Sequence, residues 1–344
     1  MKPKPSPSLP LRFLLTASGV VLMFLLCLCT GAVSLPLADV IASLRGVGDE
    51  LSTTIVMQAR LPMAVTALCC GMALSVAGLL LQTTFRNPLA GPSILGVSTG
   101  ASLGVALVMM GAGSIFGYMD GAGTRIAVIA GAAVGASAVI LLLLAFSQAV
   151  KSAAMLLIVG IMIGYLAGAV VSWLNFFAPA HVVKDFSVWG MGSFMGVTLS
   201  QLPGFAISSA VLSLLTLLLV KPLDALLLGD RYAASMGYNP KRVRTCLLLL
   251  SGALTAIATA YCGPVGFIGL AVPHIARLLF GTSAHSILLP ATLLCGALTG
   301  LLCAWLCVCP ASVGILPLGA VTPIVGVPVI IYVIIARKRL NYFQ

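Results

Sequence analysis

Charge is scarce in this chain. Only 7% of the 344 residues are charged, and just seven of them are Asp or Glu. Soluble domains carry about 25% charged residues, whereas here 60% of the residues are apolar and the mean hydropathy is +1.18. These values exclude an ordinary soluble protein and predict a polytopic membrane protein.

A nucleotide-binding loop is also missing. The phosphate-cradling pattern G-x-x-x-x-G-K-[ST] occurs nowhere, and no Lys directly follows a Gly. A helical His-Glu-x-x-His is absent too, and the three His residues are dispersed. We therefore expect a chain that is not an enzyme and that binds no covalent cofactor. If it moves a solute uphill, a separate subunit must supply the energy.

Acidic residues are absent from the middle of every predicted span. Ion-coupled carriers usually place an ionisable group there, so an ion-coupled secondary transporter is kept only as an alternative. The ten Cys lie mostly within apolar segments, where small buried hydrophobes are expected. Metal ligation by Cys69-Cys70 or by Cys307 and Cys309 is the alternative for these side chains.

The fold class predicted from the apolar segments is all-α, with about ten transmembrane helices. A spanning helix needs about 20 apolar residues. The eighth segment holds Gly263, Pro264 and Pro273, which indicates either a broken, half-depth helix or a kinked one. Residues 1–10 are expected to be a disordered tail, and 11–339 one transmembrane domain. The expected helices cover 11–33, 62–84, 94–112, 124–147, 153–176, 202–220, 243–262, 265–280, 286–308 and 314–336.

Charge distribution predicts the orientation. If both termini are cytoplasmic, most Lys and Arg fall on cytoplasmic loops, and an even number of spans agrees with this arrangement. The net charge of +11 then reports topology, and no nucleic-acid partner is expected. An N-terminal secretory signal ending near Cys29 is the alternative for the first apolar run. In this orientation four cations lie on the outer, non-cytoplasmic side of the membrane: Arg45, Arg60, Arg125 and Lys184.

Two polar interruptions stand out among the spans. Residues 221–244 form a charged cytoplasmic loop, which we interpret as a docking surface for a soluble motor. Residues 86–96 contain Pro88 and Pro92, which prevent a continuous helix. This second segment is either a gate, in which Asn87 and Leu89 close a passage, or a tight cytoplasmic turn.

Several motifs in these segments resemble the FecCD family of ABC-importer permeases, which includes vitamin B12, haem and ferric-siderophore permeases. The resemblance spans roughly residues 55–339. The motifs are Arg86-Asn87-Pro88-Leu89-Ala90-Gly91-Pro92-Ser93-Ile94-Leu95-Gly96, Leu228-Gly229-Asp230-x-x-Ala233-x-x-Met236-Gly237, Gly263-Pro264-Val265-Gly266-Phe267-Ile268-Gly269 followed by Pro273-His274-x-x-Arg277, and Leu316-Pro317-Leu318-Gly319.

The resemblance implies a vitamin B12 permease-like fold in the bacterial inner membrane. It also implies a homodimer around a central path, two ABC ATPase subunits that use ATP on the cytoplasmic side, and a substrate-binding protein on the other side. Membrane lipid surrounds the assembly. The implied site residues are Leu228, Gly229, Asp230, Ala233, Met236 and Gly237 for ATPase coupling, and Asn87, Pro88, Leu89, Ser152 and Ala153 for the translocation gate.

Docking of the binding protein is where the chain departs from the family. Members commonly show Arg-Leu-Pro-Arg before the second helix, but this chain reads Arg60-Leu61-Pro62-Met63. Arg60 is then the remaining docking candidate, with anchoring at the lipid headgroups as its alternative. The cargo implied by the resemblance is an iron chelate, a ferric siderophore or haem, with cobalamin as the alternative.

Overall fold

Helices make up the whole regular structure of the described chain. The computed structural model describes residues 8–31, 33–112, 122–150, 153–309 and 314–336, and these ranges contain no β-strand. Most of the expected tail, residues 1–7, lies outside them. The elements are α1 Leu9–Cys29, α2 Leu37–Leu44, α3 Glu50–Thr54, the π-helical η1 Ile55–Arg60, α4 Leu61–Phe85, α5 Val97–Ala106, the π-helical η2 Leu107–Ala112, α7 Ala122–Ala149, α8 Ala153–Phe177, α9 Ala180–Gly190, α10 Leu202–Leu217, α11 Val220–Leu227, α12 Asp230–Ser235, α13 Pro240–Cys262, α14 Ile268–Phe280, α15 His285–Val308 and α16 Leu318–Ala336.

Membrane-length helices follow the predicted order. Six stretches of the described chain are long and apolar enough to cross a membrane, and α10 with α11 forms a further pair bent by 57°. Three shorter apolar helices cover Val97–Gly111, Ile268–Phe280 and Leu318–Val333. Together these correspond one by one to the ten predicted segments, so the all-helical, multi-pass prediction is confirmed.

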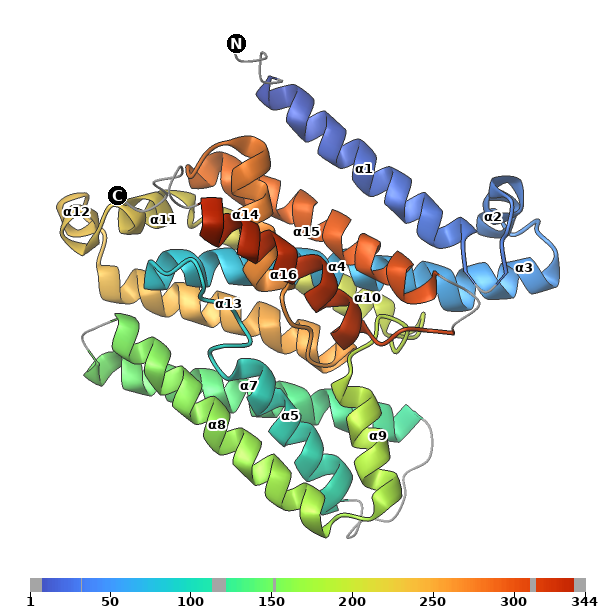
Figure 1. The fold of residues 1–344 in the computed structure, drawn as a ribbon, viewed down its shortest axis with the longest axis horizontal. Coiled ribbons are helices and arrows are strands. Elements are labelled where there is room, and N and C mark those ends of the chain that lie inside the picture. The colour runs from blue at the N-terminus through green and yellow to red at the C-terminus, as the bar shows by residue number, and fades with distance from the viewer. Residues whose placement is uncertain (1–7, 32, 113–121, 151–152, 310–313, 337–344) are drawn as a thin grey trace.

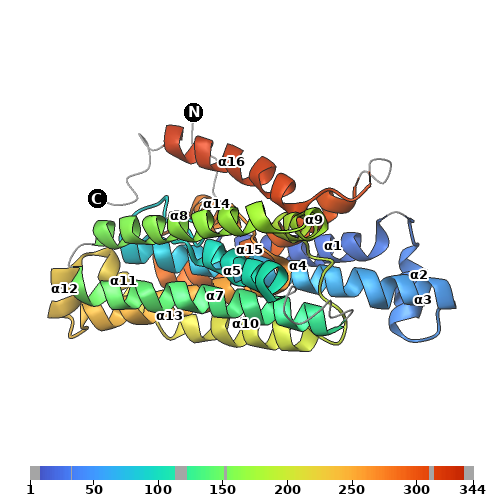
Figure 2. The same cartoon turned by 90° about the horizontal axis from the view of Figure 1, so that it is seen from below.

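The second span is the centre of the molecule. It runs without interruption from Glu50 to Phe85, and 83% of its most apolar stretch is buried, against 17% for α1 and for α8. Helices α10, α13, α14 and α15 pack against it. Figure 1 shows a second group, α5, α7, α8 and α9, lying beside this centre, and Figure 2 shows α16 lying along one side.

Glycine sets the distance between the central helices. A Cβ added at Gly71 would lie 2.1 Å from the carbonyl oxygen of Gly296, and one at Gly104 would lie 1.9 Å from that of Gly131. Small residues let helix backbones approach in this way, and close packing with van der Waals contact stabilises helix pairs in lipid. The α4–α15 and α5–α7 pairs therefore depend on positions where no side chain fits.

Two ends of the molecule carry different short helices. Figure 1 shows α12 at one end and α2 with α3 at the other. Helix α1 begins, and α16 ends, toward the α12 end. The first and last helices thus have their outer ends toward the same end of the molecule, which agrees with an even number of spans.

Two local features differ from the prediction, and a third decides between its two alternatives. The structure adds α2, α3 and α9, short helices that hydropathy does not detect. The sixth span bends at Leu218–Leu219 and is not straight over 202–220. The eighth span is a helix of 13 residues, about 20 Å long at 1.5 Å per residue. It is preceded by a non-helical segment with positive φ at Gly263 and Phe267, so it is a broken helix.

Candidate coupling site and gate loop

Helix α12 is a short helix of 6 residues that lies between two glycines. Gly229 precedes it with φ +119° and ψ 160°, and Gly237 follows it with φ +83°. Residues other than glycine rarely adopt such backbone angles, which explains why glycine occupies both positions. Ala233, on the inner face of α12, has no exposed surface. It packs α12 onto its own subunit.

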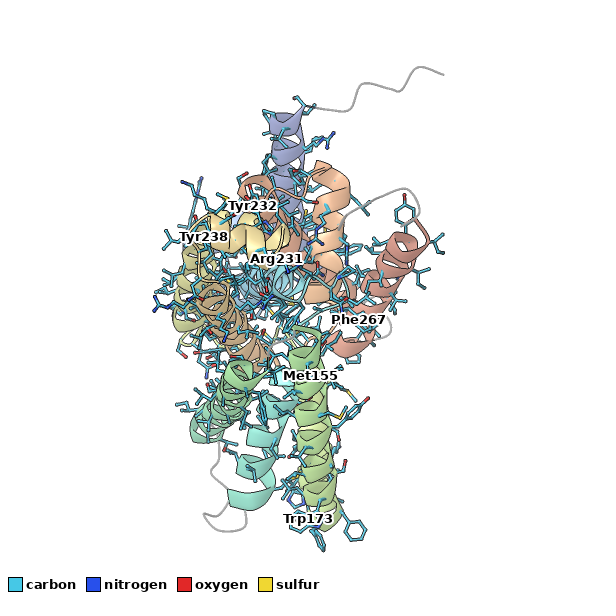
Figure 3. All side chains as sticks on the ribbon, turned by 90° about the vertical axis from the view of Figure 1, so that its left-hand side faces the viewer. Met155, Trp173, Arg231, Tyr232, Tyr238 and Phe267 are labelled. Atoms are coloured by element: carbon cyan, nitrogen blue, oxygen red, sulfur yellow. The ribbon has the colours of Figure 1, made fainter. Side chains whose placement is uncertain are left out.

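The outer face of this segment is apolar and exposed. Leu228 is 66% exposed, Tyr232 46% and Met236 54%. Leu228 precedes Gly229, Tyr232 lies within α12 and Met236 follows it, so the three exposed apolar side chains gather around this short helix. Figure 3 views the molecule from the α12 end and shows Arg231 and Tyr232 there. The surface formed by Leu228, Tyr232 and Met236 is called the α12 apolar face below.

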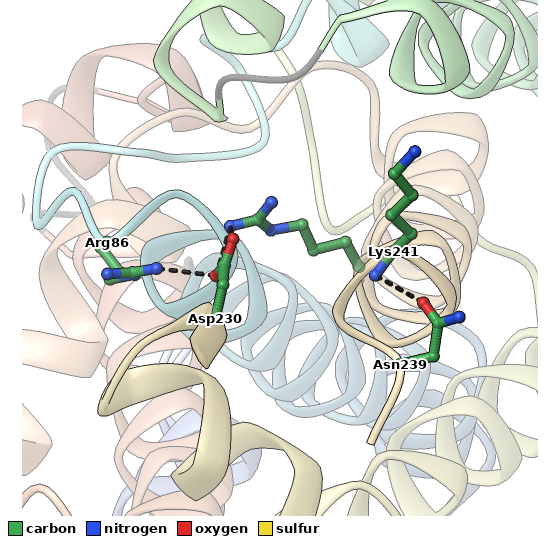
Figure 4. Close-up of polar contacts among 5 residues, drawn as sticks. Arg86, Asp230, Asn239 and Lys241 are labelled. Carbon is green, nitrogen blue, oxygen red and sulfur yellow. Dashed lines mark hydrogen bonds and ion pairs between the residues drawn. The ribbon is translucent and has the colours of Figure 1, made fainter. Parts of the chain in front are cut away.

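Asp230 joins α12 to two distant segments. Its Oδ1 accepts a hydrogen bond from Arg86 Nη2 at 2.7 Å. Arg244 Nη2 donates to Oδ1 at 2.8 Å and to Oδ2 at 2.9 Å. Figure 4 shows the Asp230 carboxylate facing the Arg86 guanidinium group. Arg86 ends α4 and Arg244 lies in the first turns of α13, so one carboxylate connects three helices.

The segment after α4, residues 86–89, forms the predicted gate loop. Arg86 ends the helix in the left-handed conformation, with φ 45° and ψ 37°, which costs on the order of 1–3 kcal/mol for a residue other than glycine. Asn87 Oδ1 accepts the backbone N–H of Leu89 at 2.9 Å. Asn87 therefore shapes the turn, and Leu89, 42% exposed, projects from it.

Helix α14 supports the gate loop from behind. His274 Nε2 lies 2.8 Å from the carbonyl oxygen of Pro88. Arg277 Nη1 donates to Gln82 Oε1 at 2.7 Å, and Gln82 Nε2 donates to the carbonyl of Leu270 at 3.1 Å. His274 and Arg277 are buried. Both side chains thus have structural partners, and the loop is fixed to the broken helix.

A second polar link joins α11 to the start of α15. Asp224 Oδ1 accepts the backbone N–H of His285 at 2.9 Å and its Nδ1–H at 2.7 Å. Nε2 of the same ring lies 2.9 Å from Thr83 Oγ1 in α4. The N-cap residue Ala284 offers no side-chain acceptor to α15, so Asp224 from another helix supplies it.

A cavity of about 610 Å³ lies between α12 and the helices that carry the second predicted gate. Its lining includes Asp230 and Arg244 on one side and Val150 and Leu156, from the ends of α7 and α8, on the other. Ser152 lies outside the described residues, and Ala153 is the first residue of α8. Val150 and Leu156, which line this cavity, lie within three residues of Ala153 in the sequence.

Arg60, the predicted docking residue, faces inward. It is 6% exposed. Its Nη1 donates to the carbonyl oxygen of Leu28 at 2.7 Å, and its Nη2 donates to that of Val33. Carbonyl groups in the last turn of a helix have no partner within that helix. Arg60 supplies one to α1 and ties it to the second span.

No group of three or more possible metal ligands occurs among the described residues. The described cysteines are all free thiols. Cys27 Sγ, for example, lies 3.5 Å from the carbonyl oxygen of Leu301. Their placement fits the interpretation of these thiols as small buried side chains, with Cys246 exposed at the start of α13.

Three comparisons show which known proteins this chain resembles. The model of the FecCD transport family matches residues 19–336. The chain is 34% identical over 335 residues to the vitamin B12 import system permease protein BtuC of Salmonella typhi, covering 95% of this chain and 96% of that one. The same values hold for BtuC of Salmonella newport (strain SL254). A solved structure described as an inward-facing conformation of a metal-chelate type ABC transporter superposes with a TM-score of 0.82 at 29% identity, covering 96% of this chain and 99% of that one.

The fold, the exposed loop at one end and the broken helix define a multi-pass transport subunit. The chain belongs to the FecCD transport family, and it is the permease subunit of an ABC importer, in which ATP hydrolysis is carried out by a separate subunit. The resemblance found in the sequence is confirmed.

Proposed function

We propose that a dimer of this permease is driven by two ABC ATPase subunits. Each ATPase docks on the α12 apolar face of one permease chain. The main support for this proposal is the exposure of Leu228, Tyr232 and Met236. Apolar side chains grouped on the water-exposed end of a membrane protein mark an interaction site, because a partner that covers them removes apolar surface from water. Gly229 and Gly237 give the segment its shape, and Asp230 and Ala233 hold it on the permease body.

The docking proposal is tested by co-purification with the ATPase. We expect Tyr232→Asp combined with Met236→Asp to abolish co-purification while the permease still inserts and runs as a single species on size exclusion. Ser235→Asp is the matched control, because Ser235 is exposed on the same helix but lies outside the apolar face. Retention of the ATPase by the double variant would contradict the proposal.

The orientation that goes with this proposal places α12 in the cytoplasm. Lys221, Arg231, Lys241, Arg242 and Arg244 all lie in or next to the segment 221–244, as the positive-inside rule requires for a cytoplasmic loop. Both termini then lie on the cytoplasmic side of the bacterial inner membrane. The substrate-binding protein would dock at the opposite end, near α2, α3 and α9. Arg60 lies too deep there to meet a partner's carboxylate without breaking its own hydrogen bonds.

A homodimer is proposed around helix α8. Its large side chains are exposed along the whole helix, from Met155 at 54% through Tyr165 at 71% to Phe176 at 82%. Figure 3 shows Trp173 of this helix at the outer edge of the subunit. A second copy would cover this face and enclose a central path. The gate would then consist of Asn87, Pro88 and Leu89 with Ser152 and Ala153.

The proposed cargo is a metal chelate. A ferric siderophore or haem is the first candidate, and cobalamin is the alternative that the BtuC relatives suggest by name. Uptake of labelled ferric siderophore, haem and cyanocobalamin in cells lacking this gene tests the proposal. Loss of one uptake, restored by the intact chain and not by Tyr232→Asp with Met236→Asp, is the expected result. Unchanged uptake of all three would contradict it.

A further inference from the structure

One carboxylate connects the proposed docking helix to the gate loop. Asp230 is the first residue of α12, and its partner Arg86 is 144 positions away, at the first position of the gate loop. The contact is direct, with 2.7 Å between Arg86 Nη2 and Asp230 Oδ1. Figure 4 shows the two side chains reaching toward each other from α12 and from the end of α4.

The other partner of Asp230 fixes the carboxylate from the opposite side. Arg244 Nη2 contacts both carboxylate oxygens, and its side chain is only 19% exposed. Arg244 belongs to α13, a helix packed on α4 and α7. Arg244 therefore orients the Asp230 carboxylate while that carboxylate binds Arg86 of the loop.

The contact continues beyond Arg86 into the membrane-embedded part. The carbonyl of Pro88, two residues after Arg86, is bonded to His274 of α14. The Asp230–Arg86 contact, the backbone from Arg86 to Pro88 and the Pro88–His274 contact thus connect α12 through the gate loop to the broken helix. Segments joined by such contacts move together when one of them is displaced as a rigid body.

A contribution to folding stability does not explain why the Arg86–Asp230 pair is present. The Arg86 and Asp230 side chains are 43% and 42% exposed, and ion pairs this exposed contribute little to folding. Arg86 also adopts the left-handed backbone conformation, which is unfavourable for a residue with a Cβ. Strained residues of this kind cluster where a structure has to switch.

We propose that Asp230 is a positioning residue that transmits displacement of α12 to the gate loop through Arg86. This inference rests on the proposed function, in which the ATPase binds α12. The ATPase moves α12, Asp230 carries the movement to Arg86, and the turn that holds Leu89 follows. Arg244 keeps the carboxylate oriented toward Arg86.

The experiment uses the permease–ATPase complex purified with its own ATPase. Cys246, the one exposed cysteine among the described thiols, is replaced by Ser, and Leu89→Cys reports on the gate loop. The rate of maleimide labelling at position 89 is measured without nucleotide and in the ATP–vanadate state. With Asp230 intact, we expect nucleotide to change the rate by about fivefold or more, the usual range for coupled sites.

Variants locate the transmission at the Arg86–Asp230 contact. Asp230→Asn and, separately, Arg86→Gln are expected to abolish the nucleotide-dependent change in labelling. Asp230→Glu keeps the charge and is expected to retain it. Lys241→Gln is the matched control, because it removes a neighbouring positive charge that lies outside the Arg86–Asp230–Arg244 group.

Each outcome has a defined meaning because co-purification is recorded before labelling. Failure of the unaltered chain to bring down the ATPase would contradict the proposed function, and this inference with it. Binding of the ATPase with an unchanged nucleotide response in both Asp230→Asn and Arg86→Gln would overturn the inference alone. Binding with no nucleotide response in the Asp230-intact complex would also overturn it.

Discussion

Gly78 of α4 lies directly against the carbonyl group of Gly269 in α14. A Cβ placed on Gly78 would be 1.6 Å from the oxygen of Gly269 and 2.8 Å from its Cα. Both atoms belong to the backbone, so no rotation of a side chain could relieve the contact. The broken helix that supports the gate loop is thus seated on the central helix at a position that admits only glycine.

Gly78→Ala is expected to destabilise the permease by about 3 kcal/mol or more, since overpacking that displaces a backbone lies at or beyond the upper end of the usual cost. The measurement is the thermal midpoint of the detergent-solubilised protein on size exclusion. Gly266→Ala is the matched control, because a Cβ at Gly266 meets nothing within 4 Å. Equal midpoints for the two variants would show that the Gly78 contact is not rigid.

Arg60→Ala separates anchoring from docking. The change leaves the carbonyl groups of Leu28 and Val33 without their donor. Leu28 is buried, and an unsatisfied buried polar group costs about 1–3 kcal/mol, whereas Val33 is 55% exposed and its carbonyl can bind water. We expect a lower thermal midpoint, with an unchanged salt dependence of binding-protein association in the fraction that stays folded. Slower association with an unchanged midpoint would instead assign Arg60 to docking.

Much of the fold follows from the sequence because lipid requires long apolar helices. Hydropathy thus locates the ten spans, and Pro88 and Pro92 locate the break after Phe85. Helices α2 and α9 are short and amphipathic, and such segments carry no membrane signal. Leu218, at the bend, lies four residues before Pro222, whose ring crowds the Leu218 carbonyl and which has no N–H to bond it. Hydropathy alone does not register this local cause.

The candidate site was predictable in its segments but not in its contacts. The sequence indicates that Asp230 lies in a docking loop and that Arg86 begins a gate loop. It contains no signal that they meet across 144 positions. Arg244 and the His285–Asp224 pair were missed for the same reason. The inward directions of Ala233 and Arg60 depend on which face of each helix packs against its neighbours. Uniform hydrophobicity hides that face around Arg60, and α12 is too short for a sequence period to show it.

Asp224→Ala is expected to loosen the cytoplasmic end of α11. The change removes the acceptor for the backbone N–H and for the Nδ1–H of His285, whose side chain is 1% exposed. Because the His285 side chain is buried, leaving its Nδ1–H unpaired should lower the free energy of unfolding by about 1–3 kcal/mol. Proteolysis in the segment 221–244 should accelerate in step with this loss. Asp185→Asn, at an exposed position of α9, should leave the proteolysis rate as it is.

Cysteine cross-linking tests the proposed homodimer. Tyr165→Cys places a thiol on the exposed face of α8, and mild oxidation should link two permease chains through it. Leu214→Cys, on α10, is an equally matched exposed position at 60% and should remain monomeric on a non-reducing gel. Cross-linking from α10 and not from α8 would place the interface elsewhere.

The central claim, that α12 receives the ATPase, is tested most directly by photocross-linking in native membranes. Benzoylphenylalanine is introduced in place of Tyr232 on α12 and, as the control, in place of Val188 on α9, which is 59% exposed near the other end. The account predicts a cross-linked product containing the ATPase from position 232 and none from position 188. An ATPase product from position 188, or its absence from position 232 in membranes that contain the assembled complex, would contradict the account.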